Sequence, residues 1–180
     1  MTKKQLLLNA IVLKRTNTGE TDRVVTLLTQ EQGKVICVAK GVRKLKSSKR
    51  AFLEPGNYIK AYLIKTKSLP LLTQAQLIQD FAQSKSSLIR IRKLSQVLEI
   101  LEKLFVNETI PANLYQELLK LLTHLNQAQV SNRLIKNKLA ELIAALGFVH
   151  PQQTKHQSIL DYVAEISERP VRSFEYLTVS

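Results

Sequence analysis

Seven basic side chains and no acidic one fall between residues 34 and 50 of the sequence. They are Lys34, Lys40, Arg43, Lys44, Lys46, Lys49 and Arg50. A cluster of basic side chains without nearby acids raises the local electrostatic potential. When a polyanion binds to it, counterions are released, which favours binding. The plainer alternative is a solvated loop that binds nothing. We favour the first interpretation, which predicts a segment that binds a polyanion.

The excess of positive charge is concentrated in the first half of the chain. The 180 residues have a formal net charge of +13, yet residues 1–80 alone carry 15 basic and 5 acidic side chains, a net +10. Apolar residues make up 44% of the sequence, which is typical of a globular protein with a packed core. No apolar run reaches the roughly 18 residues of a membrane-spanning helix, so we expect a cytoplasmic protein with no membrane partner.

Residues that could perform covalent or metal chemistry are few and scattered. Cys37 is the only cysteine, and it lies in an apolar run at residues 35–38, which predicts a buried thiol. Glu20 and Asp22 are the only close carboxylate pair in the basic half, whereas a two-metal nuclease needs several carboxylates. The histidines at 124, 150 and 156 show no metal-ligand spacing. We therefore expect no enzymatic activity, no metal and no cofactor.

Short runs rich in Val, Ile and Leu, separated by turn residues, fill the sequence before Asp80. They predict five strands, at residues 6–15, 23–29, 34–41, 57–65 and 71–78. The longest gap, between the third and fourth strands, contains most of the basic cluster. Five strands in about 75 residues with this spacing are typical of a small β-barrel of the oligonucleotide-binding (OB) type. A fragment of a β-sandwich is the alternative that the pattern leaves open.

After Asp80 the apolar residues recur at helical spacing. The first predicted helix spans residues 84–106, and others begin near Pro111, after the capping residue Ser131 and after the capping residue Ser158. Gly147 is placed to end the third of them. The predicted fold class is therefore α+β, with an N-terminal five-stranded OB-type barrel at residues 1–80 and an all-α helical domain at residues 81–180.

The fourth predicted strand offers a second way to bind nucleic acid. Alternation along this strand places Tyr58, Lys60 and Tyr62 on one face and residues 59, 61 and 63 on the other. Two aromatic rings beside a base could hold single-stranded nucleic acid, because each stacked base contributes about 1–3 kcal/mol. Packing of this face against the helical half is the alternative.

Several segments of the sequence together resemble the RecO family of bacterial DNA repair proteins. The resemblance is strong over residues 6–56 and looser over most of the rest, where the segment 142–148 with its Leu-Gly ending looks like the family's central helix and residues 168–173 like its final segment. The matching N-terminal residues are Ile11-Val12-Leu13, Gly19-Glu20-Thr21-Asp22-Arg23-Val24-Val25-Thr26-Leu27-Leu28-Thr29, Gly33-Lys34, Ala39-Lys40-Gly41-Val42-Arg43-Lys44, Ser47 and Leu53-x-Pro55.

The resemblance implies an OB-type barrel followed by a helical domain. It also implies a recombination mediator that binds single- and double-stranded DNA, anneals complementary strands, and works with RecR and the acidic tail of single-stranded-DNA-binding protein (SSB) to load RecA. In one respect the sequence departs from the family. Many relatives carry a four-cysteine zinc module after the Leu-Gly helix, whereas residues 148–158 here contain no cysteine. Partner contacts that depend on that module are therefore in doubt.

If the chain acts as the resemblance implies, phosphates should bind the seven bases of the cluster, with Arg23 and the bases at residues 90–93 extending the surface. Bases beside an apolar groove could bind the acidic tail, and the candidates are Arg90, Arg92, Lys136 and Lys138. Two other functions stay open. One is an RNA-binding OB-fold protein of the translation or ribosome machinery, and the other is a nuclease.

Overall fold

The computed structural model describes residues 5–44, 47, 49–127 and 129–172. The chain divides into two compact units. The first comprises Met1–Asp80 together with Phe105–Ile110, and the second comprises Phe81–Leu104 together with Pro111–Ser180. Within the described part of the chain, no helix has the length and hydropathy needed to cross a bilayer.

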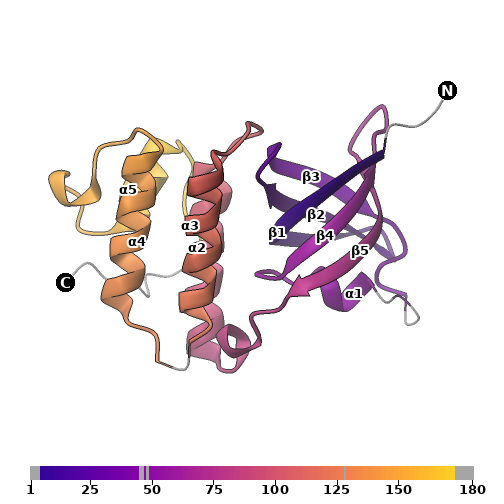
Figure 1. Cartoon of the computed structure of the whole chain (residues 1–180), viewed down its shortest axis with the longest axis horizontal. Helices are drawn as coiled ribbons and strands as arrows, with labels where there is room; N and C mark the ends of the chain where they lie inside the picture. Colours follow the sequence, from indigo (N-terminus) through magenta and orange to yellow (C-terminus); the bar gives the residue numbers. More distant parts are fainter. Residues whose placement is uncertain (1–4, 45–46, 48, 128, 173–180) are drawn as a thin grey trace. The chain divides into compact units, whose positions relative to one another are not determined.

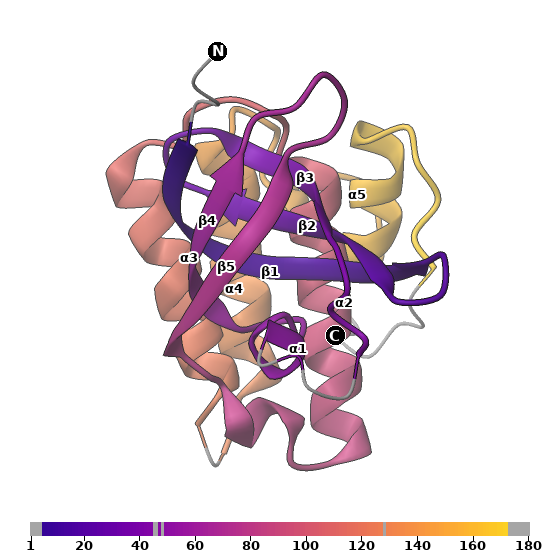
Figure 2. The same cartoon turned by 90° about the vertical axis from the view of Figure 1, so that its right-hand side faces the viewer.

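Five strands form most of the first unit: β1 (Gln5–Thr18), β2 (Asp22–Thr29), β3 (Gly33–Ala39), β4 (Tyr58–Ile64) and β5 (Leu71–Gln79) (Figure 1). They close on themselves in the order β1-β2-β3-β5-β4, and all neighbours are antiparallel except β3 and β5. That last junction is one parallel residue pair, Val38 and Leu71. A short helix, α1 (Lys49–Phe52), precedes β4 and lies beside β5 (Figure 2). This arrangement is of the OB type, so the predicted fold class is confirmed.

The core of this unit consists of the inward-facing side chains of the strands. Every strand that the apolar pattern predicted is present, and its ends differ from the prediction by three residues at most. β4 shows the reason most clearly, because its burial alternates residue by residue and only its second, fourth and sixth side chains are buried. The pattern could therefore fix the strand and its inward face together.

The second unit is helical: η1 (Ala82–Lys85), α2 (Leu88–Leu104), α3 (Ala112–Leu125), α4 (Asn132–Ala145), η2 (Pro151–Gln153) and α5 (Ile159–Ile166). Ser131 and Ser158 cap α4 and α5 as predicted, because their hydroxyls accept hydrogen bonds from the backbone N–H groups of Leu134 and Leu160. The first helix is shorter than the predicted span of 84–106. A separate 3₁₀ turn precedes it, and the chain leaves the helix after Leu104.

Phe105–Ile110 leaves the helical path because its backbone bonds to the β2–β3 turn of the first unit. The Lys34 N–H donates to the Val106 carbonyl at 2.8 Å, and the Ile110 N–H donates to the Gln30 carbonyl at 2.8 Å. Gly33, in the same turn, has a φ of +58°, and a Cβ there would lie 2.2 Å from the Glu108 carbonyl oxygen. Only glycine leaves room for this close approach.

Replacing Gly33 with alanine should therefore destabilise the protein. The strained backbone alone costs about 1–2 kcal/mol, and the clash with the 105–110 backbone should add about 1–3 kcal/mol. Gly19→Ala is the matched control, since Gly19 has a similar φ of +54° but nothing within 4 Å of its added Cβ. Urea denaturation of both variants measures the difference, and equal destabilisation would show that the close approach costs nothing.

Candidate nucleic-acid interface

Residues 40–57, which we call the basic loop, connect β3 to β4 and are fixed at both ends. Val42 and Leu53 are fully buried in the barrel core. Near the end of the loop, the Asn57 side-chain amide donates to the carbonyls of Ala51 and Phe52 at 3.1 Å each, which closes the last turn of α1. The loop backbone then pairs with β1, since the Gly56 N–H donates to the Val12 carbonyl at 2.8 Å.

The start of the basic loop is tied to the turn between β1 and β2. The Gly41 N–H donates to the Asp22 carboxylate at 2.8 Å, and this bond is the main reason why the pKa of Asp22 is lowered. The Arg43 N–H donates to the Thr21 carbonyl at 2.9 Å, and its guanidinium Nη1 donates to the Gly19 carbonyl at 3.2 Å. Asp22 thus acts as a structural acceptor for the loop.

The bases of the loop differ in how far they are engaged. Lys40, Lys44 and Arg50 have exposed side chains. Lys49 is half-buried, and its ammonium donates to the Thr73 carbonyl of β5 at 3.2 Å. Lys46 lies outside the described residues. Lys40, Lys44 and Arg50 are therefore the exposed bases among the described residues of the loop, and exposed positive charges favour ligands that carry phosphates.

Two predicted phosphate ligands differ from the exposed bases of the loop. Lys34 is at the opposite end of β3 from Lys40, and seven residues of strand place the two backbones about 20 Å apart. Arg23 lies close enough to Arg50 for their charges to interact, but it is only 5% exposed, because it continues the inward-facing row of Val25 and Leu27. Its Nε donates to the Asn17 side chain at 3.2 Å. Lys34 is therefore too distant to act together with the exposed bases of the loop, and Arg23 is near them but buried.

The predicted aromatic face of β4 forms as alternation requires. Tyr58, Lys60 and Tyr62 are half-buried on the outer face, whereas the three residues between and after them belong to the core. Burial raises the pKa of Tyr58, the nearby charge of Glu31 raises it further, and a hydrogen bond with Asn9 lowers it. The Tyr58 hydroxyl is therefore already engaged at the edge of this face.

Two of the four predicted partner-binding bases have structural roles in the helical unit. The Arg90 guanidinium donates to the carbonyls of Leu125 and Gln127 at 3.1 and 2.5 Å, at the C-terminal end of α3. Lys138 forms an ion pair with Glu117 at 3.3 Å, and the pKa of Glu117 is lowered by hydrogen bonds from Lys120 and Lys138. Arg92 is exposed on α2.

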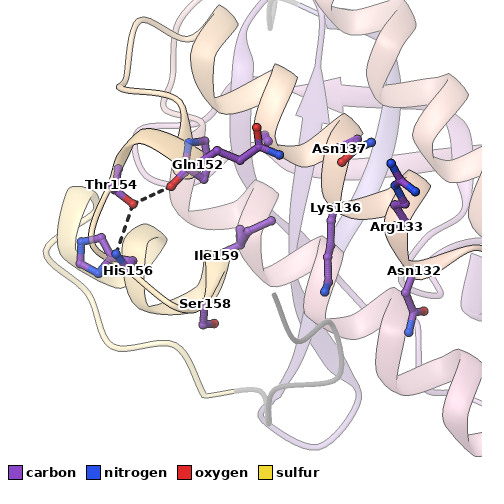
Figure 3. Close-up of a pocket in the computed structure, with 11 residues that line it drawn as sticks. Asn132, Arg133, Lys136, Asn137, Gln152, Thr154, His156, Ser158 and Ile159 are labelled. Carbon is purple, nitrogen blue, oxygen red and sulfur yellow. Dashed lines mark hydrogen bonds between the residues drawn. The ribbon is translucent and has the colours of Figure 1, made fainter. Parts of the chain in front are cut away.

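The fourth, Lys136, lines a groove of about 620 Å³ between α4 and the segment 151–159 (Figure 3). Arg133 lines the same groove, one turn earlier on α4, and Ala140 and Ile159 supply apolar wall. The far wall is held by Thr154, whose hydroxyl donates to the Pro151 carbonyl at 2.7 Å (Figure 3). The groove therefore combines positive charge with apolar surface.

Chemistry at Cys37 is disfavoured by its surroundings. The side chain is fully buried, and burial raises the pKa of its thiol to about 12. Within the described residues, no three His, Cys, Asp or Glu side chains gather closely enough to hold a metal ion. His150 and His156 have local contacts instead: His150 Nδ1 accepts a hydrogen bond from the Gln152 N–H at 3.3 Å, and His156 Nε2 lies 2.9 Å from the Glu165 carboxylate.

Two further residues of the candidate interface, Arg15 and Glu54, were not predicted from the sequence. The Arg15 guanidinium donates to the Glu54 carboxylate at 2.8 Å, across 39 residues of sequence. Arg15 lies in a predicted strand, and Glu54 is the only acid in residues 32–79. A lone acid in a basic stretch of sequence indicates that Glu54 has a specific role, but it does not identify the base with which Glu54 pairs.

The Cys37 thiol should resist alkylation in the folded protein. Its pKa of about 12 leaves almost no thiolate at pH 8, whereas an exposed thiol with a pKa of 9.0 is partly ionised. Because the folded pKa is the higher one, the thiol contributes stability that is present below pH 9 and is lost as the pH rises towards 12. Labelling with iodoacetamide in the presence and absence of urea measures the reactivity of the thiol. Rapid labelling of the folded protein, without urea, would contradict the predicted resistance to alkylation.

Comparisons with known proteins agree with the geometry. Residues 1–81 match the family described as Recombination protein O N terminal. A DNA repair protein RecO from Syntrophomonas wolfei is 29% identical over 139 residues, covering 77% of this chain and 56% of the relative. One from Shouchella clausii is 30% identical over 148 residues, covering 81% and 57%. One from Heliobacterium modesticaldum is 38% identical over 95 residues, covering 53% and 35%. The chain thus spans about half the length of the curated relatives it matches, and these matches support the RecO family.

Proposed function

We propose that this chain is a DNA repair and recombination mediator that binds single- and double-stranded DNA through the basic loop. The observation that carries the proposal is the exposure of Lys40, Lys44 and Arg50 on a loop whose two ends are fixed in the barrel. Exposed positive charges on one loop favour a ligand with closely spaced phosphates. The names of the relatives, DNA repair protein RecO, support DNA as that ligand.

Annealing of complementary strands follows from the same chemistry. Contacts to phosphate position a strand without reading its bases, so the bases stay available for pairing. A basic surface that holds two strands screens their mutual repulsion and raises their local concentration. The outer face of β4 could hold a single strand in addition, since Tyr58 and Tyr62 flank Lys60 there. No covalent step and no nucleotide cofactor is required.

The groove beside α4 is our candidate for the protein partner. In a recombination mediator that assists RecA loading together with RecR and SSB, the acidic tail of SSB needs basic residues beside an apolar wall. Lys136 and Arg133 supply the charge, and Ala140 and Ile159 supply the wall. Arg90 and Lys138 are less suited, because one caps α3 and the other pairs with Glu117.

Removing the three exposed charges of the loop should weaken DNA binding and make it less sensitive to salt. The triple variant Lys40→Gln, Lys44→Gln, Arg50→Gln should lower the log–log salt slope for single-stranded DNA by about 2, since each phosphate contact contributes about 0.7. Fluorescence anisotropy with a labelled oligonucleotide measures the slope. The same variant should anneal complementary oligonucleotides more slowly.

A matched control removes the same charge from the helical unit, by Lys103→Gln, Lys155→Gln and Arg169→Gln. If this variant loses as much affinity as the loop variant, binding depends on total charge and the loop is not the site. Competition between RNA and DNA of one sequence separates the proposal from a role in translation, because preference for RNA requires contacts to the 2′-hydroxyl. A consistent preference for RNA would favour that alternative.

Charge reversal in the groove should weaken binding of an acidic peptide. Lys136→Glu with Arg133→Glu replaces two favourable charge contacts with repulsion, and we expect a loss of affinity of about tenfold or more for a peptide with the sequence of the SSB tail. Lys103→Glu with Arg169→Glu changes the net charge equally within the same unit, at residues that do not line the groove. Isothermal titration calorimetry compares them, and equal losses would place the peptide elsewhere.

A further inference from the structure

Four arginines lie close together where the basic loop meets the ends of β1 and β2, because the charges of Arg15, Arg43 and Arg50 all act on Arg23. We call these four residues the arginine cluster, and one carboxylate, that of Glu54, lies beside two of them. The Glu54 carboxylate lies 2.8 Å from Arg15 Nη2 and 3.7 Å from Arg23 Nη1. Burial lowers the pKa of Arg23, and the charges of the other three arginines lower it further, whereas Glu54 raises it. The cluster therefore holds more positive charge than its single carboxylate neutralises.

The hydrogen-bonding capacity of the cluster is also incompletely used. Among the residues that the structure describes, Arg15 Nε and Arg23 Nη1 are buried and have no hydrogen-bond partner. The contact of Arg23 with Glu54 is longer than a hydrogen bond, so Glu54 accepts a hydrogen bond only from Nη2 of Arg15. Arg23 belongs to the inward row of β2 and cannot turn its guanidinium to bulk water. Donors in this state favour an additional acceptor.

A phosphodiester suits these donors better than a carboxylate does. Guanidinium groups bind phosphate oxygens in pairs, and a tetrahedral phosphate offers acceptors in more directions than a planar carboxylate. Arg15 and Glu54 have side chains that are 31% and 36% exposed, so their ion pair is open to solvent at one side. An exposed ion pair of this kind is weak and can exchange partners.

We propose that Arg15 is a further phosphate-binding residue and that Glu54 is its built-in competitor, which occupies the donors until a DNA backbone phosphate replaces it. The inference rests on the proposed function, since it concerns the same DNA surface. It goes beyond that function by assigning a ligand to Arg15 and by giving the one acid of the loop a regulatory role. The alternative is that Glu54 only braces α1 against the strands.

The two roles predict opposite effects of Glu54→Gln, which keeps the size of the side chain but removes its charge. If Glu54 competes with phosphate, the variant should bind a labelled oligothymidine about threefold more tightly, with a steeper salt slope. If Glu54 is only a brace, the variant should lose thermal stability and bind DNA no better. Failure of the variant to fold counts for the brace and overturns the proposal.

Glu141→Gln is the matched control, since it removes one exposed carboxylate from α4, in the helical unit. Equal gains in the two variants would show a general charge effect and overturn the competition. Arg15→Gln tests the ligand directly. It should weaken binding, and the loss should be larger in the Glu54→Gln background, where no carboxylate competes. Unchanged or tighter binding by Arg15→Gln also overturns the proposal.

The loop variant separates this inference from the proposed function. If the triple replacement of Lys40, Lys44 and Arg50 leaves affinity unchanged, DNA does not bind at this surface and both proposals fail. If that variant binds weakly but Glu54→Gln shows no gain, the proposed function stands and only the competition between Glu54 and phosphate is refuted.

Discussion

The burial of Val42 and Leu53 in the barrel core is the constraint on which the charged surface depends. The positive side chains of the loop, which has only one acid, repel one another. In isolation the loop would expand, because a larger distance between the charges lowers their repulsion. Two apolar side chains that are fully buried hold its two ends on the same barrel. Each such burial contributes about 1.5–3 kcal/mol, which exceeds the weak repulsion between solvated charges. Hydrophobic burial thus maintains a charge density that electrostatics alone would disperse.

Two of the few acids of the barrel unit lie against the basic loop. Asp22 accepts the Gly41 N–H, and Glu54 binds Arg15. Both carboxylates keep their negative charge, and the charges of Lys40 and Lys44 help to lower the pKa of Asp22, so these acids offset part of the positive charge of the loop. Because 15 basic side chains face only 5 acidic ones over residues 1–80, a net charge of +10 remains.

Local features of this protein could be predicted from the sequence, and pairings across the chain could not. Alternation and turn glycines locate all five strands, because these signals act between neighbouring residues. The capping serines Ser131 and Ser158 locate two helix starts for the same reason. The contact of Arg15 with Glu54, and the departure of residues 105–110 from the helical path, depend on how distant segments pack. No local pattern encodes either of them.

The difference between local pattern and long-range packing also explains why two arginines in similar sequence surroundings have different roles. Arg90 and Arg50 look alike in sequence, each beside other bases, but Arg90 caps α3 whereas Arg50 is exposed on the loop. What distinguishes them is whether a carbonyl or carboxylate lies within reach, and that is decided by the fold. The charge of a segment therefore indicates where a polyanion could bind, and the acceptors around each base decide which side chains stay exposed. For this protein Lys40, Lys44 and Arg50 are exposed on the loop, which is why we propose them as the first bases to contact phosphate.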